Sequence, residues 1–200
     1  IVNPKGTSAG TTIEWTPSMT PDGATVRLAY SPNAGGSNAG DKGGSGTQTS
    51  VEQSGWDATV ALTSDFTGVD GLTLNAGIAN VDQDAGNATT DDSREERTIA
   101  VTYAFSNWTV GYQWAEVENG KSSGAQKYTN DGYGITFNVN DDLSLGFNHF
   151  ESEQDNDTDV KTEAESLQVA YTMGGASFRI ADAKVDNAAY STAAGSDVEA

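Results

Sequence analysis

Apolar and polar residues alternate with a period of two along most of this chain, and that period predicts β-strands rather than helices. The four prolines lie outside the interiors of these runs, where a proline would interrupt a hydrogen-bonded ladder. We therefore expect an all-β chain of about ten antiparallel strands. The runs lie at about residues 11–16, 24–31, 55–63, 71–81, 96–105, 108–117, 132–139, 143–151, 165–173 and 176–185.

The connections between these runs alternate between short and long. Tight turns are expected at residues 106–107, 140–142 and 174–175, and slightly longer ones at 17–23 and 64–70. Short turns at one end of the strands and long loops at the other are typical of a membrane β-barrel. Long polar connections are expected at residues 32–54, 82–95, 118–131, 152–164 and 187–200.

The tight turns also predict which residues of neighbouring strands lie on the same face of the sheet. Residues that flank a tight hairpin turn face the same side of the sheet. Phe105 and Trp108 flank such a turn, and each belongs to the apolar set of its strand. The same relation joins Met173 to Ala176 and Val139 to Leu143. The opposite face is small and polar, with Thr136, Asn138, Ser144, Gly146, Asn148, Gln168, Ala170 and Thr172.

Aromatic residues fall into two groups along the apolar face. Trp15, Phe105, Trp108 and Phe178 lie near the short-turn ends, and Tyr30, Trp56, Trp114 and Tyr133 lie toward the long-loop ends. Two aromatic bands that flank a belt of aliphatic residues are typical of barrels at the two membrane interfaces. The simpler alternative is that aromatic residues favour strands in general.

Composition narrows the class of protein. Only 36% of the residues are apolar and 23 are glycine, which suits a barrel whose outer face alone must be apolar. The absence of cysteine excludes thiol catalysis, cysteine zinc clusters and disulfides. With 29 acidic against 10 basic residues, nucleic acid is not an expected partner, and a preference for cations is weakly predicted.

Two segments resemble the general porins of Gram-negative outer membranes, especially those of alphaproteobacterial type. They are the hairpin of residues 97–103 with 108–112, and residues 166–176. The resemblance implies a sixteen-stranded transmembrane β-barrel that forms a water-filled channel for passive diffusion of small hydrophilic solutes and ions. It also implies a homotrimer in contact with outer-membrane lipid and lipopolysaccharide, with no enzyme activity and no required cofactor.

Ten strands would enclose too small a lumen for a water-filled pore. We therefore expect residues 1–200 to be part of a single barrel domain, with further strands missing at both ends. The N-terminal Ile1 is neither an initiator methionine nor part of a signal segment.

Charged and polar residues on the non-aromatic side are the candidate pore-lining residues. A charge facing lipid near mid-bilayer costs about 2–4 kcal/mol for Arg or Lys, so the water-filled side is favoured. Arg27 and Arg179 are of most interest, because arginines that face acidic residues create a transverse field in the pore. The alternative is that each charge is solvated without a selective role. The candidates are Glu14, Arg27, Asp57, Glu96, Gln113 and Arg179.

The long connection at residues 32–54 is the candidate for a loop that folds inward and narrows the pore. Its Gly and Ser content instead favours an external loop. A second acidic loop carries Asp155, Asp157 and Asp159, whose carboxylates are the oxygen ligands that calcium takes. The loop lacks the spacing of an EF-hand. Its functional interpretation is divalent bridging to lipopolysaccharide phosphates, and the favoured alternative is a solvated acidic surface without such a role.

Two other classes of protein remain open. One is a secreted, acidic, β-rich surface or adhesion protein that binds calcium. The other is an outer-membrane enzyme built on a barrel, which is the weaker candidate because no catalytic set is present. His149 is the only histidine and has no nucleophile or second histidine beside it in the sequence.

Overall fold

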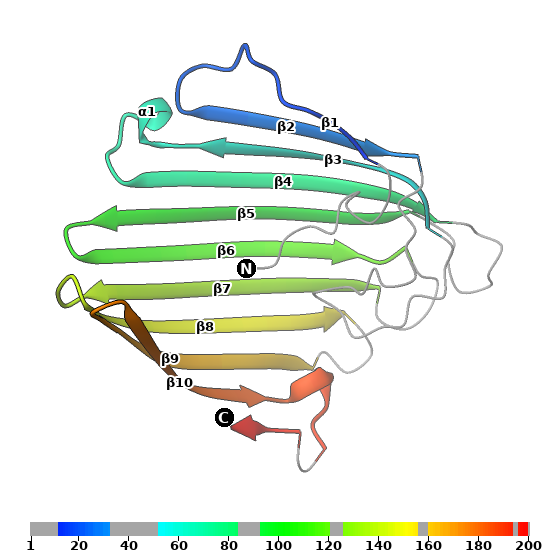
Figure 1. The fold of residues 1–200 in the computed structure, drawn as a ribbon. Coiled ribbons are helices and arrows are strands. Elements are labelled where there is room, and N and C mark those ends of the chain that lie inside the picture. The colour runs from blue at the N-terminus through cyan, green and yellow to red at the C-terminus, as the bar shows by residue number, and fades with distance from the viewer. Residues whose placement is uncertain are drawn as a thin grey trace.

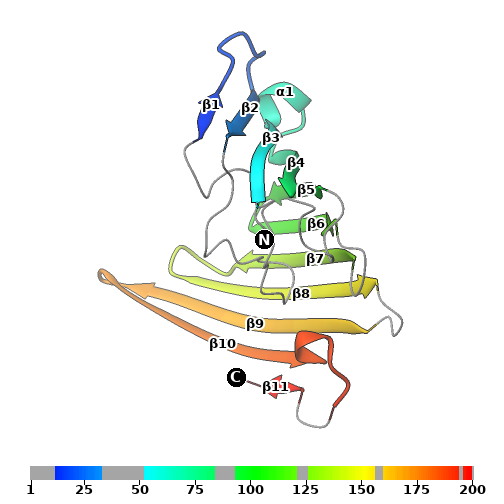
Figure 2. The ribbon, with the colours of Figure 1, turned by 90° about the vertical axis from the view of Figure 1, so that its right-hand side faces the viewer.

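A single antiparallel sheet makes up the computed structural model, which describes residues 12–32, 52–83, 93–120, 126–155, 160–193 and 196–199. Within these residues the sheet has 11 strands, and every strand pairs with its neighbours in sequence order, β1 to β11 (Figure 1). Figure 2 shows that the sheet curves into an open trough. The edge strands β1 and β11 do not pair with each other in the described part of the chain.

Most of the strands are long. They are β1 (Ile13–Trp15), β2 (Ala24–Ser31), β3 (Glu52–Leu62), β4 (Leu72–Gln83), β5 (Arg94–Phe105), β6 (Trp108–Glu118), β7 (Lys127–Asn138), β8 (Leu143–Asp155), β9 (Lys161–Met173), β10 (Ala176–Asp186) and β11 (Val198–Glu199). Two short helices interrupt the connections: α1 (Ser64–Thr67) between β3 and β4, and the 3-10 helix η1 (Ala188–Tyr190) after β10. No helix among the described residues has the length and hydropathy that a membrane crossing requires.

The structure confirms the facing predicted at the tight turns. Phe105 is the register partner of Trp108, and Met173 is the partner of Ala176. At the three-residue turn the backbone N–H of Val139 donates to the carbonyl oxygen of Leu143 at 2.9 Å. In Figure 1 the short turns gather at one end of the strands, and the strand ends that lead into the long connections gather at the opposite end.

The strands extend further than the apolar pattern predicts. β4 continues to Gln83, β7 begins at Lys127 and β8 continues to Asp155, so parts of the loops predicted at 82–95, 118–131 and 152–164 are strand. Charged residues still alternate in these extensions, but on the face that is apolar elsewhere, so polarity alone resembled a loop. β11 likewise lies inside the segment predicted as a loop at 187–200.

A glycine determines the path of the β3–β4 connection at the short-turn end of the strands. Gly71 has a φ of +76°, and its carbonyl oxygen accepts a hydrogen bond from the backbone N–H of Ala104 at 2.9 Å. A Cβ at this position would overlap the carbonyl oxygen of Ala104. The β3–β4 connection can therefore close against the end of β5 only with glycine at this position.

Candidate channel wall

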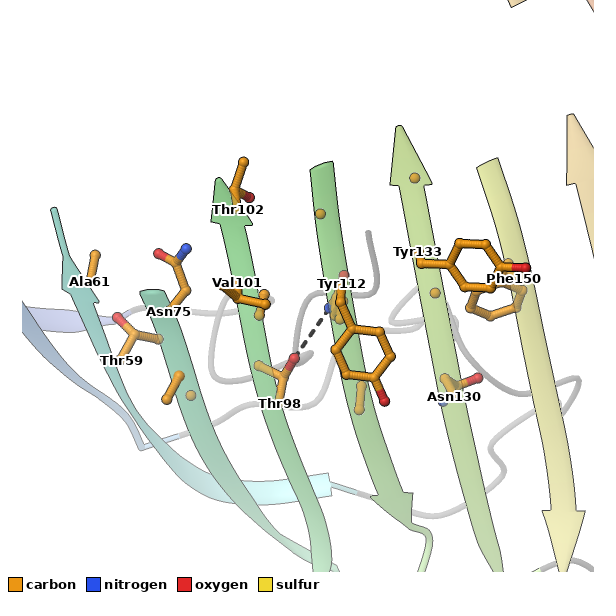
Figure 3. Close-up of a pocket in the computed structure, with 18 of the residues that line it drawn as sticks. Thr59, Ala61, Asn75, Thr98, Val101, Thr102, Tyr112, Asn130, Tyr133 and Phe150 are labelled. Carbon is orange, nitrogen blue, oxygen red and sulfur yellow. Dashed lines mark hydrogen bonds between the residues drawn. The ribbon is translucent and has the colours of Figure 1, made fainter. Parts of the chain in front are cut away.

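The concave face of the sheet is lined by small and hydroxyl- or amide-bearing side chains. These residues border a cavity of about 850 Å³ that runs across β2 to β8. Gln113 Nε2 donates to Thr98 Oγ1 at 3.2 Å between β6 and β5 (Figure 3). Such a surface leaves room for water and offers it hydrogen-bonding partners. Its side chains include Thr25, Thr59, Asn75, Thr98, Thr102, Thr109, Thr136 and Asn148.

The convex face is apolar and open. Ile99 and Ile180 keep 60% and 71% of their surface exposed, and they lie on strands five apart in the sheet. Exposed apolar surface of this extent is not found on a soluble monomer without a covering partner. Other exposed residues on this face are Leu28, Tyr30, Trp56, Tyr103, Phe105, Trp108, Tyr133, Ile135, Leu145, Leu167, Val169 and Phe178.

The apolar run on the convex face stops at a defined position on each strand. On β5, for example, Phe105, Tyr103, Val101 and Ile99 are followed by Arg97 and Glu95. Beyond that position the convex face carries polar and mostly charged residues to the end of the strand. The first polar or titratable residues on β4 to β10 are Asn80, Arg97, Glu116, Asp131, His149, Glu165 and Asp182.

This boundary crosses the sheet obliquely. The register row through Asp182 on β10 passes through Leu167, Phe147, Ile135, Val110 and Tyr103 and reaches β4 at Leu72. The boundary residue on β4 is Asn80, eight positions further along that strand. Between β10 and β4 the boundary therefore shifts by about 27 Å along the strand direction over six interstrand spacings of about 4.8 Å. This slope corresponds to a strand tilt of roughly 43°. Strands in closed membrane barrels tilt by 35–45°, so a boundary of this slope is level in such a barrel.

The height of the apolar band can be compared with that of a membrane. Four outward apolar residues on β5, from Ile99 to Phe105, span roughly 20 Å of strand between the first and last Cα atoms, which is about 15 Å of height at that tilt. The apolar belt of outer-membrane barrels is about 25 Å tall, and the bacterial outer membrane is thinner than average. Tyr30, Trp56, Trp114 and Tyr133 occupy the long-loop border of the band, as the aromatic pattern predicts.

Ion pairs cover the convex face beyond the band. Glu116 accepts from Lys127 Nζ at 2.6 Å and lies 3.9 Å from Arg97, which also pairs with Glu95 at 2.8 Å. Further ion pairs join Lys161 to Glu151 at 2.7 Å and to Glu153 at 3.1 Å, and His149 Nδ1 lies within hydrogen-bonding distance of Glu165 Oε1 at 3.2 Å. At the border itself, the Tyr112 hydroxyl donates to Asp131. We call this surface of β5 to β10 the charged collar.

All six predicted pore-lining residues lie on the concave face, although their role in a pore stays a prediction. Glu14, Asp57 and Glu96 fall in one register row on β1, β3 and β5, and Arg27 lies in the next row toward the short turns. Gln113 borders the cavity. Arg179 is exposed near the short-turn end of β10. Arg27 and Arg179 are eight strands apart, so the structure does not bring them together.

Glu96 differs from Glu14 and Asp57, the other predicted pore-lining carboxylates, because it is buried. Arg94 Nη2 pairs with Glu96 Oε1 at 2.8 Å, and the two side chains are only 1% and 5% exposed. Arg94 was missed because the predicted strand began at residue 96 and the arginine fell in a predicted loop. A buried pair of this kind fixes the long-loop end of the wall, since neither charge can lose its partner without a large desolvation cost.

The predicted calcium ligands receive no support from the described residues. Asp155 ends β8 with its side chain exposed, and Asp157 and Asp159 lie outside the described residues. Among the residues that the structure describes, no group of three or more His, Cys, Asp or Glu side chains could hold a metal ion. The predicted constriction loop, residues 32–54, also lies mostly outside the described ranges.

Comparison with known proteins decides the family. The family model described as Gram-negative porin matches residues 2–177. The chain belongs to the Gram-negative porin family. Gram-negative porins are outer-membrane proteins, so this porin chain is assigned to the bacterial outer membrane. No curated protein matches the sequence.

Solved porin structures share the fold of this chain. The anion-selective porin from Comamonas acidovorans superposes with a TM-score of 0.68 at 14% identity, over 88% of this chain and 49% of that one. A porin refined at 1.8 Å resolution superposes with a TM-score of 0.56 at 13% identity, over 88% of this chain and 55% of that one. The porin chain described here thus spans about half the length of these structures, and its open sheet corresponds to an arc of their barrels.

Proposed function

We propose that this porin chain supplies part of the wall of a water-filled outer-membrane channel for passive diffusion of small hydrophilic solutes and ions. The observation that carries the proposal is the pairing of two surfaces on one sheet. An apolar band faces outward on the convex side, and a surface of small and polar side chains lies on the concave side. That arrangement matches the requirements of a barrel in lipid with a polar interior.

The charges on the described strands favour weak rather than strong ion selectivity. The strand residues on the concave face include three carboxylates, Glu14, Asp57 and Glu96, and three arginines, Arg27, Arg94 and Arg179. On the charged collar, by contrast, carboxylates outnumber basic residues. The net charge of -19 therefore lies largely outside the concave wall, and it is a poor guide to which ions pass.

The same geometry supports the proposed partners. The apolar band would contact the hydrocarbon of the membrane, and the charged collar would lie at the height of the headgroups and lipopolysaccharide. A homotrimer is proposed from the family alone. The alternative of a secreted, calcium-binding adhesion protein lacks an observation in its favour, because a soluble protein has no use for a level apolar band.

Reconstitution of the full-length protein in a planar lipid bilayer tests the proposal. We expect stepwise current increases whose size grows with salt concentration, and no steps from heat-denatured protein at the same concentration. A folded full-length protein that inserts into bilayers without conductance would refute the channel. A protein that stays soluble without detergent and gains stability with calcium would favour the adhesion alternative.

A further inference from the structure

The segment after β10 turns back onto the concave wall. Asn187 occupies the position next to Thr162 of β9, and Thr162 Oγ1 donates to the carbonyl oxygen of Asn187 at 2.8 Å. The backbone N–H of Tyr190 donates to the same Thr162 Oγ1 at 3.2 Å, and Asn187 Nδ2 donates to the carbonyl oxygen of Lys161 at 3.1 Å. We call residues 187–193 the strap. It is attached to the concave side of β9, to which Thr162 belongs.

The Tyr190 side chain extends this attachment to two more strands. Ser152 Oγ on β8 donates to Asn130 Oδ1 on β7 at 2.7 Å, and it lies 2.6 Å from the Tyr190 hydroxyl. A serine hydroxyl has one proton, so the Tyr190 hydroxyl must be the donor to Ser152. The Tyr190 ring also packs on Tyr128 with centroids 5.5 Å apart. Both Ser152 and Asn130 are buried, so this chain of hydrogen bonds is shielded from water.

The backbone of the strap is strained, which shows that these contacts determine its path. Asn187, Ala189 and Tyr190 have φ values of 52°, 56° and 58°, in the left-handed region that non-glycine residues rarely adopt. Such residues cost about 1 kcal/mol or more each and persist only where surrounding contacts hold them.

We propose that the strap narrows the channel at its long-loop entrance and that Tyr190 holds it in place. This inference rests on the proposed function. The strap backbone is bonded to β9, and the Tyr190 side chain reaches β8, so the two together cover about two interstrand spacings, or roughly 10 Å of the wall. A sixteen-stranded barrel with this tilt has a backbone radius of roughly 17 Å and a narrower free lumen. A layer about 5 Å thick over that arc occupies roughly a tenth of a free lumen about 12 Å in radius.

Single cysteines test whether the strap lies in the conducting path, because the native chain contains no cysteine. In the full-length protein, Ala189→Cys places a thiol on the strap, and Lys184→Cys places one on the convex face of β10 nearby. After treatment with a bulky, charged thiol reagent, we expect stepwise loss of conductance for Ala189→Cys and no change for Lys184→Cys. Complete labelling of Ala189→Cys without any change in current would overturn the proposal.

Removal of a single oxygen atom tests the role of Tyr190. Tyr190→Phe abolishes the hydrogen bond to Ser152 and keeps the ring, whereas Tyr171→Phe removes the same atom on the convex face. Because the contacts of the strap with β9 remain in Tyr190→Phe, we expect the open-channel conductance to rise by at most about a tenth, with passage of larger sugars in liposome swelling. Ser152→Ala should act in the same direction, and Tyr171→Phe should match wild type.

The outcomes separate the strap from the channel itself. A wild-type protein without conductance refutes the proposed function and the strap's role together. If the wild type conducts but Tyr190→Phe and Ser152→Ala both keep its conductance and size exclusion, Tyr190 does not hold the strap in place. The proposed channel function is then unaffected.

Discussion

The loss of folding stability caused by a lysine on the convex face should depend on its height in the tilted barrel and not on its register row. Val101 on β5 and Glu165 on β9 belong to one register row, through Tyr112, Tyr133 and His149. The slope of the boundary nevertheless places Val101 near the middle of the apolar band and Glu165 in the charged collar. Val101→Lys and Glu165→Lys are therefore a matched pair in register that differ in depth.

The expected magnitudes follow from depth alone. A lysine near the bilayer midplane of a barrel costs about 2–4 kcal/mol, and one near the interface costs about 0–1 kcal/mol. Glu165→Lys also loses the 3.2 Å contact with His149, an exposed pair that contributes little. Thr102→Lys on the concave face is the lumen control, and it should cost little because its ammonium group reaches water.

The free energy of unfolding measured by denaturant titration of the full-length protein in lipid vesicles gives these costs. The account predicts that Val101→Lys loses at least about 2 kcal/mol more than Glu165→Lys and Thr102→Lys. Equal costs at Val101 and Glu165 would refute the tilt inferred from the boundary. A larger cost at Thr102 than at Val101 would refute the assignment of the two faces.

Three further predictions follow from individual contacts. Arg94→Met should destabilise the folded protein by about 3–5 kcal/mol by leaving Glu96 buried without its arginine, as denaturant titration can measure. Gly71→Ala should lower the free energy of unfolding by more than Gly174→Ala, because both have positive φ but only Gly71 faces a backbone carbonyl at overlapping distance. Arg27→Gln should shift the reversal potential in a salt gradient toward cations, and an unchanged potential would exclude Arg27 from the ion path.

The facing of the strands could be predicted because tight turns leave little freedom of register. Once Phe105 and Trp108 flank a two-residue turn, every residue of β5 and β6 is assigned to a face. The concave positions of Arg27, Asp57 and Gln113 follow from the same alternation. Sequence alone also indicated the aromatic borders, since Trp56 and Trp114 end the apolar runs of their strands.

Three features could not be predicted, for different physical reasons. The charged collar is strand, but its charged residues occupy the face that is apolar elsewhere, so the predicted apolar pattern ends where the collar begins. The pair of Arg94 and Glu96 is buried by long-range packing, which a short window of sequence does not contain. The strap depends on Tyr190 reaching Ser152, 38 residues away in the chain, and nothing local predicts that contact.

The central claim is that the concave face of this sheet meets water and the convex face meets lipid. Single cysteines at positions 98 to 104 of β5, in the full-length protein reconstituted in lipid vesicles, test it most directly. The account predicts that a water-soluble thiol reagent labels cysteines at positions 98, 100, 102 and 104 and spares those at 99, 101 and 103. Labelling without this period of two, or labelling of the odd positions alone, would contradict it.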